Sequence, residues 1–145
     1  MSDLESRLRR TEDILEIQQL FFDYGAHLDA GRFEDYASLF AEDGKVMLGP
    51  MGSATGPAEI QALMEKALGG SAGSSFHVIS SPQINLDGDT ATSQVMWTVL
   101  NQDDDGKPML GMVGFHRDKL VREDGRWKFL ERRGYMSLPS TYPDR

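Results

Sequence analysis

Three Asp-Gly pairs constrain the fold of this chain more than any other feature, because each one separates two runs in which apolar and polar residues alternate. The pairs are Asp87-Gly88, Asp105-Gly106 and Asp124-Gly125, and the runs cover residues 75–86, 90–102, 108–122 and 126–136. Asp-Gly between alternating runs is the strongest short-range signal for a β-hairpin. The second half of the chain is therefore predicted to be an antiparallel meander of four long strands.

The first half has the period of an α-helix instead. Ser2 and Glu5 have the spacing of a capping box, and apolar residues then recur every three or four positions as far as Leu28. This pattern predicts one long helix that ends near Asp29 and is stopped by Gly31.

Shorter elements follow the long helix. The apolar spacing predicts a second helix over residues 33–40, before Glu42-Asp43-Gly44, and a short strand over residues 45–48. Pro57 stands at a first helical position, which predicts a third helix over residues 57–68 that ends at Gly69. Helices that precede the strands indicate the α+β class, with the sheet curling over the helices. Long strands bend at bulges, and a bent sheet over helices leaves a hollow.

Length and composition indicate one soluble domain. The chain has 145 residues, of which 39% are hydrophobic and 26% charged, so it can bury a core without disulfide bonds or structural metal ions. We expect one domain over residues 1–137 and a C-terminal tail over residues 138–145.

The charge and the N-terminus exclude several classes of protein. The net charge of −8 repels nucleic acid and anionic lipid, so we expect neither as a partner. The N-terminus lacks the basic start and apolar stretch of a signal peptide, and no apolar run is long enough to cross a membrane. The absence of cysteine fits a reducing compartment, and we expect a cytoplasmic protein.

Metal and cofactor signals are weak. His27, His77 and His116 are too dispersed for a helical zinc motif, and the sequence contains neither a dinucleotide-binding glycine motif nor a Walker loop. We therefore expect no metal and no cofactor, and an enzyme of this sequence has to work with acids, bases and hydrogen-bond donors.

Tyr24, Asp29 and His77 are the candidates for such chemistry. Tyr24 and Asp29 stand near the end of the long helix, and their directions differ by roughly 140° on an ideal helix, although the helix end can relax that angle. His77 lies among apolar residues at the start of a strand, where alternation can turn it inward. Two alternatives remain open: Asp29 as a turn acid, and His77 as a hydrogen-bonded structural histidine.

Taken together, the residues resemble a known family. The matching stretches are Tyr24-x4-Asp29-Ala30-Gly31-x-Phe33-x-Asp35-Tyr36, Gly56-Pro57-x2-Ile60, Phe76-His77-x4-Pro82-x-Ile84, Asp87-Gly88-Asp89-x-Ala91 and Gly114-Phe115-His116-Arg117-Asp118. This combination resembles the SnoaL-like branch of the nuclear transport factor 2-like superfamily. Scytalone dehydratase, hexachlorocyclohexane dehydrochlorinase and bile-acid 7α-dehydratase, all cofactor-free lyases, are similar by motif. The resemblance implies a cone-shaped α+β barrel, with the N-terminal helices in the concave face of a mainly antiparallel sheet.

The resemblance also implies a site. An Asp-His pair in a conical pocket falls on Asp29 and His77, with Tyr24 as a group that polarises the substrate. The late basic residue of the family falls on Arg132 or Arg133, and strand alternation favours Arg133. We expect His116 and Trp97 to contact the substrate as well, although His116 stands where many relatives have tyrosine.

The expected function is a cofactor-independent, dehydratase-like elimination on a small hydrophobic, cyclic substrate. Histidine suits the base, since its ordinary pKa is near 6.5, and a carboxylate partner fixes its tautomer. The open alternatives are an isomerase, a polyketide cyclase or an epoxide hydrolase with the same pocket, or a ligand-binding or assembly domain without chemistry. The outer face of four long strands also predicts a homodimer or homotrimer.

Overall fold

The structure, a computed structural model, describes residues 1–136, so the tail predicted over residues 138–145 lies outside the described residues. In chain order the elements are α1 (Asp3–Ala30), α2 (Phe33–Ala37), β1 (Phe40–Met47), the 3₁₀ turn η1 (Gly49–Met51), β2 (Ser53–Thr55), α3 (Pro57–Leu68), β3 (Ser75–Asp87), β4 (Thr90–Gln102), β5 (Pro108–Glu123) and β6 (Arg126–Tyr135). Helices and strands are segregated along the chain as predicted, which confirms the α+β class.

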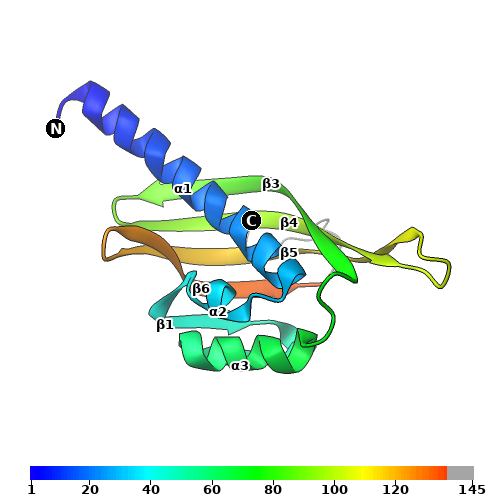
Figure 1. The fold of residues 1–145 in the computed structure, drawn as a ribbon. Helices are drawn as coiled ribbons and strands as arrows, with labels where there is room; N and C mark the ends of the chain where they lie inside the picture. The colour runs from blue at the N-terminus through cyan, green and yellow to red at the C-terminus, as the bar shows by residue number, and fades with distance from the viewer. Residues whose placement is uncertain (137–145) are drawn as a thin grey trace.

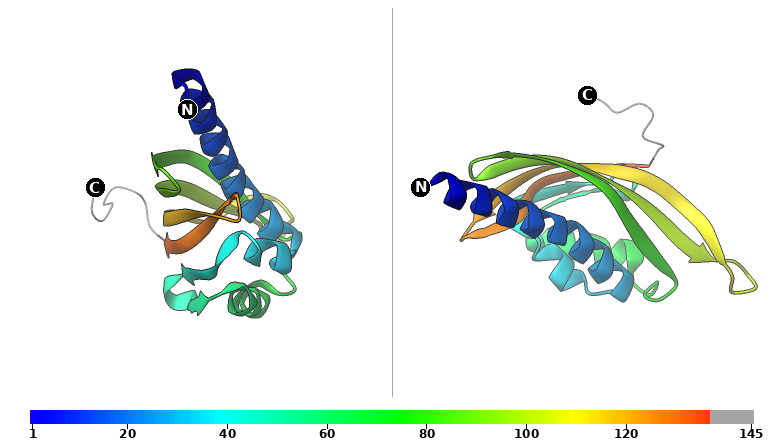
Figure 2. Two further views of the ribbon diagram at one scale, coloured as in Figure 1. Left: turned by 90° about the vertical axis from the view of Figure 1, so that its left-hand side faces the viewer. Right: turned by 90° about the horizontal axis from the view of Figure 1, so that it is seen from above.

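The strands form one curved, six-stranded sheet in the order β2-β1-β6-β5-β4-β3. The meander from β3 to β6 is antiparallel and follows the predicted hairpins, whereas β1 runs parallel to β6. The helices lie on the concave side of the sheet (Figures 1 and 2). The sheet is curved but unclosed, since β2 and β3 remain as free edges within residues 1–136, and the N-terminal helices lie in its concave face as predicted (Figure 2).

Helix α1 crosses the concave face of the sheet, and its first turns extend beyond the sheet edge (Figure 1). The Ser2 side chain caps its start by accepting a hydrogen bond from the Glu5 backbone, as the capping-box spacing predicted. Gly31 ends it in the left-handed region, at φ 71°. Its buried side chains, which include Ile17, Phe21 and Tyr24, pack against the sheet. The exposed side chains of α1 include Leu8 and Leu15.

The predicted second helix is too long at its C-terminal end. Phe40 was expected in this helix, but it opens β1 and pairs with Phe129 of the parallel strand β6. Both rings are buried, with their centroids 5.4 Å apart. Phe40 fits the apolar spacing of a helix and of a strand equally well, so the local sequence does not distinguish the two. The contact with β6 decides in favour of the strand.

The outer face of the sheet carries no helix within the described residues (Figure 2). It holds a polar hollow of about 730 Å³ bordered by side chains such as Gln83, Asn85 and Gln94. Burial of this face against a second copy, as a homodimer or homotrimer, stays a prediction. None of the described helices is both long and apolar enough to span a bilayer.

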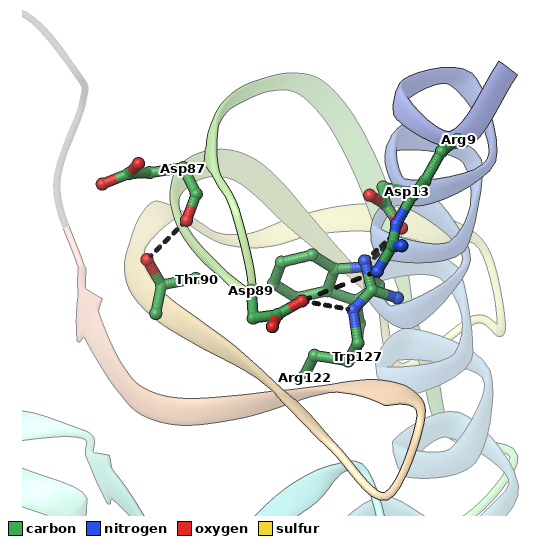
Figure 3. A network of polar contacts seen from close by, with 7 residues as sticks. All are labelled: Arg9, Asp13, Asp87, Asp89, Thr90, Arg122 and Trp127. Carbon is green, nitrogen blue, oxygen red and sulfur yellow. Dashed lines mark hydrogen bonds and ion pairs between the residues drawn. The ribbon is translucent and has the colours of Figure 1, made fainter. Parts of the chain in front are cut away.

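A polar network holds the N-terminal half of α1 against the sheet (Figure 3). The carboxylate of buried Asp13 accepts hydrogen bonds from Trp127 Nε1 at 3.0 Å and from Arg122 Nη2 at 2.7 Å. Arg122 Nε donates in turn to Asp89 at the β3–β4 turn, at 2.9 Å. Burial raises the pKa of the Asp13 carboxyl, but the two hydrogen bonds together with the positive charges of Arg122 and Arg9 outweigh it, so the pKa is lowered.

This network yields a stability prediction. Asp13→Asn should lower the free energy of unfolding at pH 7 by about 1.5–3 kcal/mol, since it removes a charged acceptor from one buried and one partly buried donor. A carboxyl with a lowered folded pKa stabilises the fold above its unfolded pKa, near 3.9, and this stability is lost as the pH falls through the folded value. The difference between wild type and variant should therefore shrink below about pH 4.

Urea titrations followed by circular dichroism at several pH values measure this difference. Asp89→Asn is the matched control, because Asp89 is 71% exposed and its ion pair with Arg122 is worth only about 0–1 kcal/mol. A difference between wild type and Asp13→Asn that is independent of pH would rule out the charge as the cause.

Candidate active site

A pocket of about 470 Å³ opens between the C-terminal end of α1, helix α3 and the concave face of the sheet. Its wall is mostly apolar, with polar side chains from α1, α2, β3, β4 and β5. The apolar lining includes Leu28, Leu48, Met51, Met64, Leu68, Val99 and Met112, and the polar and aromatic lining includes Tyr24, Asp29, Tyr36, His77, Trp97, Asn101 and His116. An apolar cavity with a few convergent polar groups is the usual form of a small-molecule site.

Asp29 and His77 are in direct contact inside this pocket. Asp29 Oδ1 lies 2.7 Å from His77 Nδ1, and the backbone N–H of His77 also reaches both carboxylate oxygens, at 3.1 and 3.0 Å. The side chains are only 23% and 15% exposed. A carboxylate on Nδ1 fixes the tautomer that carries its proton there, so the lone pair is on Nε2. No hydrogen bond within residues 1–136 occupies Nε2.

The close approach of α1 to β3 makes this contact possible. Gly25 is buried one turn before Asp29, and a Cβ atom added there would lie 3.3 Å from Ile79 and 3.4 Å from the Cβ of His77. A larger residue would push the helix away from the strand. The sequence thus brings the end of a helix against the start of a strand 48 positions later.

Tyr24, Trp97 and His116 form an aromatic floor next to the pair. Tyr24 meets both histidine rings edge to face, with centroids 5.7 Å from His77 and 5.2 Å from His116, and Trp97 lies 5.9 Å from His116. All three side chains were predicted to be in the site, and all three line the pocket. Within the described residues, Trp97 Nε1 and His116 Nδ1 are buried without a hydrogen-bond partner.

Burial controls the protonation of two tyrosines and a histidine that line the pocket. It raises the pKa of Tyr24 far above its ordinary value and raises the pKa of Tyr36 to about 12, so both hydroxyls remain protonated and can donate. Burial and the nearby Arg132 cation hold the pKa of His116 well below its usual range. His116 is therefore a neutral imidazole at pH 7, with one N–H to donate.

The prediction that Arg133 faces the pocket is wrong. Leu120 pairs with Phe129 and Lys119 with Glu131, so Leu130 is an extra residue that forms a bulge in β6. The bulge shifts the alternation by one position beyond Phe129. Arg133 consequently points to the hollow on the outer face, where it donates to the sulfur of Met47. The pocket face receives Arg132 and Gly134 instead, and only Gly134 of these two lines the cavity.

Sequence reasoning missed the buried partners of Arg132 behind the floor. Arg132 Nε donates to Asp118 at 2.9 Å, and Ser93 donates to the same carboxylate at 2.9 Å. All three side chains are buried. One signal was available: Asp118 stands at an inward position of its strand, between His116 and Leu120, where an apolar residue is the rule. Over residues 1–136, no three histidine or acidic side chains converge to hold a metal ion.

Comparisons with known proteins agree with this architecture. Uncharacterized protein Rv2910c of Mycobacterium tuberculosis is 29% identical over 126 residues, which cover 83% of this chain and 82% of that protein. The fold superposes on an NTF2-like protein with a cystatin-like fold from Novosphingobium aromaticivorans, with a TM-score of 0.84 and 28% identity over 96% of this chain and 90% of the other. A candidate scytalone dehydratase from the same organism gives a TM-score of 0.76 and 25% identity, over 94% and 91% of the two chains.

A sequence family also matches most of the chain. The SnoaL-like domain family matches residues 9–133, a range that holds every side chain of the floor and the Asp29–His77 pair. The sequence match, the curved sheet over three helices and the structural neighbours agree with one another. This chain belongs to the SnoaL-like family of the NTF2-like superfamily.

Proposed function

We propose that this protein is a cofactor-independent lyase that eliminates water from a small hydrophobic, cyclic substrate, with His77 as the general base and Asp29 as the group that orients it. The observation that carries the proposal is the 2.7 Å contact between Asp29 and His77 Nδ1 inside an apolar pocket. A domain that only binds a ligand has no need of this contact. The pair, with an unengaged Nε2, is the arrangement that general-base catalysis requires.

The proton donors and acceptors in the pocket support an elimination. His77 Nε2 takes a proton from the carbon next to a carbonyl, and the electron pair of that C–H bond moves toward the carbonyl. Tyr24 and His116 donate hydrogen bonds to the carbonyl oxygen as it becomes negative. As the C–O bond to the leaving hydroxyl breaks, a double bond forms, and the hydroxyl takes the proton from the His77 imidazolium and leaves as water, which regenerates the neutral base. Asp29 stabilises the imidazolium until the proton is released. An apolar wall strengthens these contacts because it excludes water.

Isomerisation shares the first step with this proposal. A base and hydrogen-bond donors around an enolate also move a double bond, so the same residues serve a lyase or an isomerase. Analysis of the product separates the two, since only the lyase product lacks the elements of water. A cyclisation through an enolate also begins with this proton abstraction, and its product keeps the elements of water, so product analysis separates it from the lyase as well. Epoxide hydrolysis needs a positioned water as the attacking group, and the Asp29–His77 contact alone does not favour it.

His77→Gln and Asp29→Asn should reduce turnover by about 10²–10⁴-fold, since the first removes the base and the second its orienting carboxylate. The assay uses a panel of cyclic β-hydroxy ketones that includes 3-hydroxy-1-tetralone, whose dehydration to 1-naphthol is followed by absorbance. Circular dichroism confirms that each variant is folded.

His27→Gln is the matched control for these variants. His27 lies two residues before Asp29 on the same helix, but it does not line the pocket. We expect it to retain wild-type turnover. If His77→Gln retained wild-type turnover as well, the assignment of His77 as the base would be wrong.

Tyr24→Phe tests the donor at the floor. The substitution keeps the ring in its place and removes only the hydroxyl, so we expect kcat to fall by about 10²-fold with little change in KM or in thermal stability. A rise in KM at constant kcat would contradict a role in the transition state and assign Tyr24 to binding alone.

A further inference from the structure

Arg132 is the most deeply buried charge in the described chain, with 0% exposure. Its guanidinium carbon lies 4.2 Å from the ring centroid of Tyr24 and 4.3 Å from that of Phe129. Tyr24 lines the pocket, whereas Arg132 does not. The positive charge therefore lies directly behind the pocket floor, separated from the cavity by one aromatic ring.

The polar contacts of Arg132 leave part of this cation unpaired. Nε donates to Asp118, which is also held by Ser93, but Nη1 and Nη2 find no hydrogen-bond partner within residues 1–136. A buried ion pair of this kind contributes little net stability, and unpaired buried donors cost more. Stability alone thus gives no reason for a guanidinium at this place, where an apolar side chain would pack between the same rings.

The positive member of the pair is the one that contacts the floor. Arg132 stacks on Tyr24, while Asp118 accepts hydrogen bonds from Arg132 Nε and from Ser93 of β4. The effects of the two charges on the pKa of Tyr24 agree with this arrangement. Although burial raises the pKa of Tyr24 overall, the Arg132 cation lowers it more strongly than the Asp118 charge raises it. Arg132 also acts on His116, whose pKa it helps to lower.

We infer that the Arg132–Asp118 pair is a fixed dipole behind Tyr24 and His116 that favours substrates on which an oxygen becomes negatively charged, namely cyclic ketones that pass through an enolate. Arg132 is a positioning residue in this scheme, because it acts through Tyr24 and does not touch the substrate. The substrate carbonyl lies at Tyr24 and His116, and the carbon that loses its proton faces His77. This inference rests on the proposed function and names its substrate class.

Other charged and titratable groups also face the cavity. Asp29 and Tyr24 come from α1, Tyr36 from α2, His77 from β3 and His116 from β5. Asp29 opposes an anion in the pocket, but it is present in every variant proposed here. The contribution of Arg132 is therefore measured as a difference between variants.

The test uses 4-nitrophenol, a phenol whose ionised form is coloured and whose oxygen imitates that of an enolate. The pH at which the bound probe ionises is read from absorbance at saturating protein. In Arg132→Met this pH should be higher than in wild type by about one unit, because a charge behind the floor acts through a medium of moderate dielectric constant. Arg132→Lys should keep most of the wild-type value.

Arg133→Met is the matched control, because the neighbouring arginine points to the outer face. It should leave the ionisation of the bound probe unchanged. Asp118→Asn should move it in the opposite direction from Arg132→Met, to a lower pH than in wild type, since it removes only the negative end of the pair. A loss of packing alone would not reverse the sign. Asp118→Asn decides the matter if Arg132→Met does not fold.

Equal values for bound 4-nitrophenol in wild type and Arg132→Met, or a higher value in Asp118→Asn, would overturn the inference. The measurement is independent of turnover. The same titration in His77→Gln should retain the effect of Arg132. A wrong assignment of His77 as the base and the absence of an Arg132 effect on the bound probe are therefore distinguishable results.

Discussion

The carboxylate of Asp29 is the interaction on which the site depends. It accepts hydrogen bonds from the backbone and the ring of His77, and so it joins the last turn of α1 to the first residues of β3. The same contacts hold the end of α1 against β3 at the edge of the pocket and leave Nε2 of His77 for chemistry. One short-range interaction thus couples the fold to the proposed base.

Curvature of the sheet supplies the remainder of the site. Register shifts interrupt the pairing of β3 with β4 and of β4 with β5, and the bulge at Leu130 interrupts the pairing of β5 with β6. Each shift bends the sheet toward the helices and changes which side chains face inward. The bulge in β6 turns Arg132 inward and Arg133 outward. The pocket floor is therefore a product of local irregularities in strands that are otherwise regular.

The regular parts of this structure are predictable from the sequence. The Asp-Gly turns and the alternation around them define β3 to β6 almost to the residue, and the capping box and Gly31 define α1. Local signals suffice there because each turn and cap is encoded by adjacent residues. The inward direction of His77 and Trp97 follows from the same alternation.

Features that depend on distant contacts were not predictable. No local signal marks Leu130 as an extra residue, so the choice of Arg133 over Arg132 failed. Phe40 needed its partner Phe129 to be recognised as part of a strand. The contact between Asp29 and His77 came from family resemblance, because helical geometry and strand alternation say nothing about the distance between two elements 48 residues apart.

Proton abstraction by His77 is the central claim, and hydrogen exchange measures it without a leaving group. Incubation of 1-tetralone with the protein in D2O, followed by proton NMR, reports the exchange of the protons next to the carbonyl. We expect exchange that is much faster than in buffer and that is lost in His77→Gln but kept in His27→Gln. Exchange at the buffer rate in wild type, or at the wild-type rate in His77→Gln, would contradict this claim.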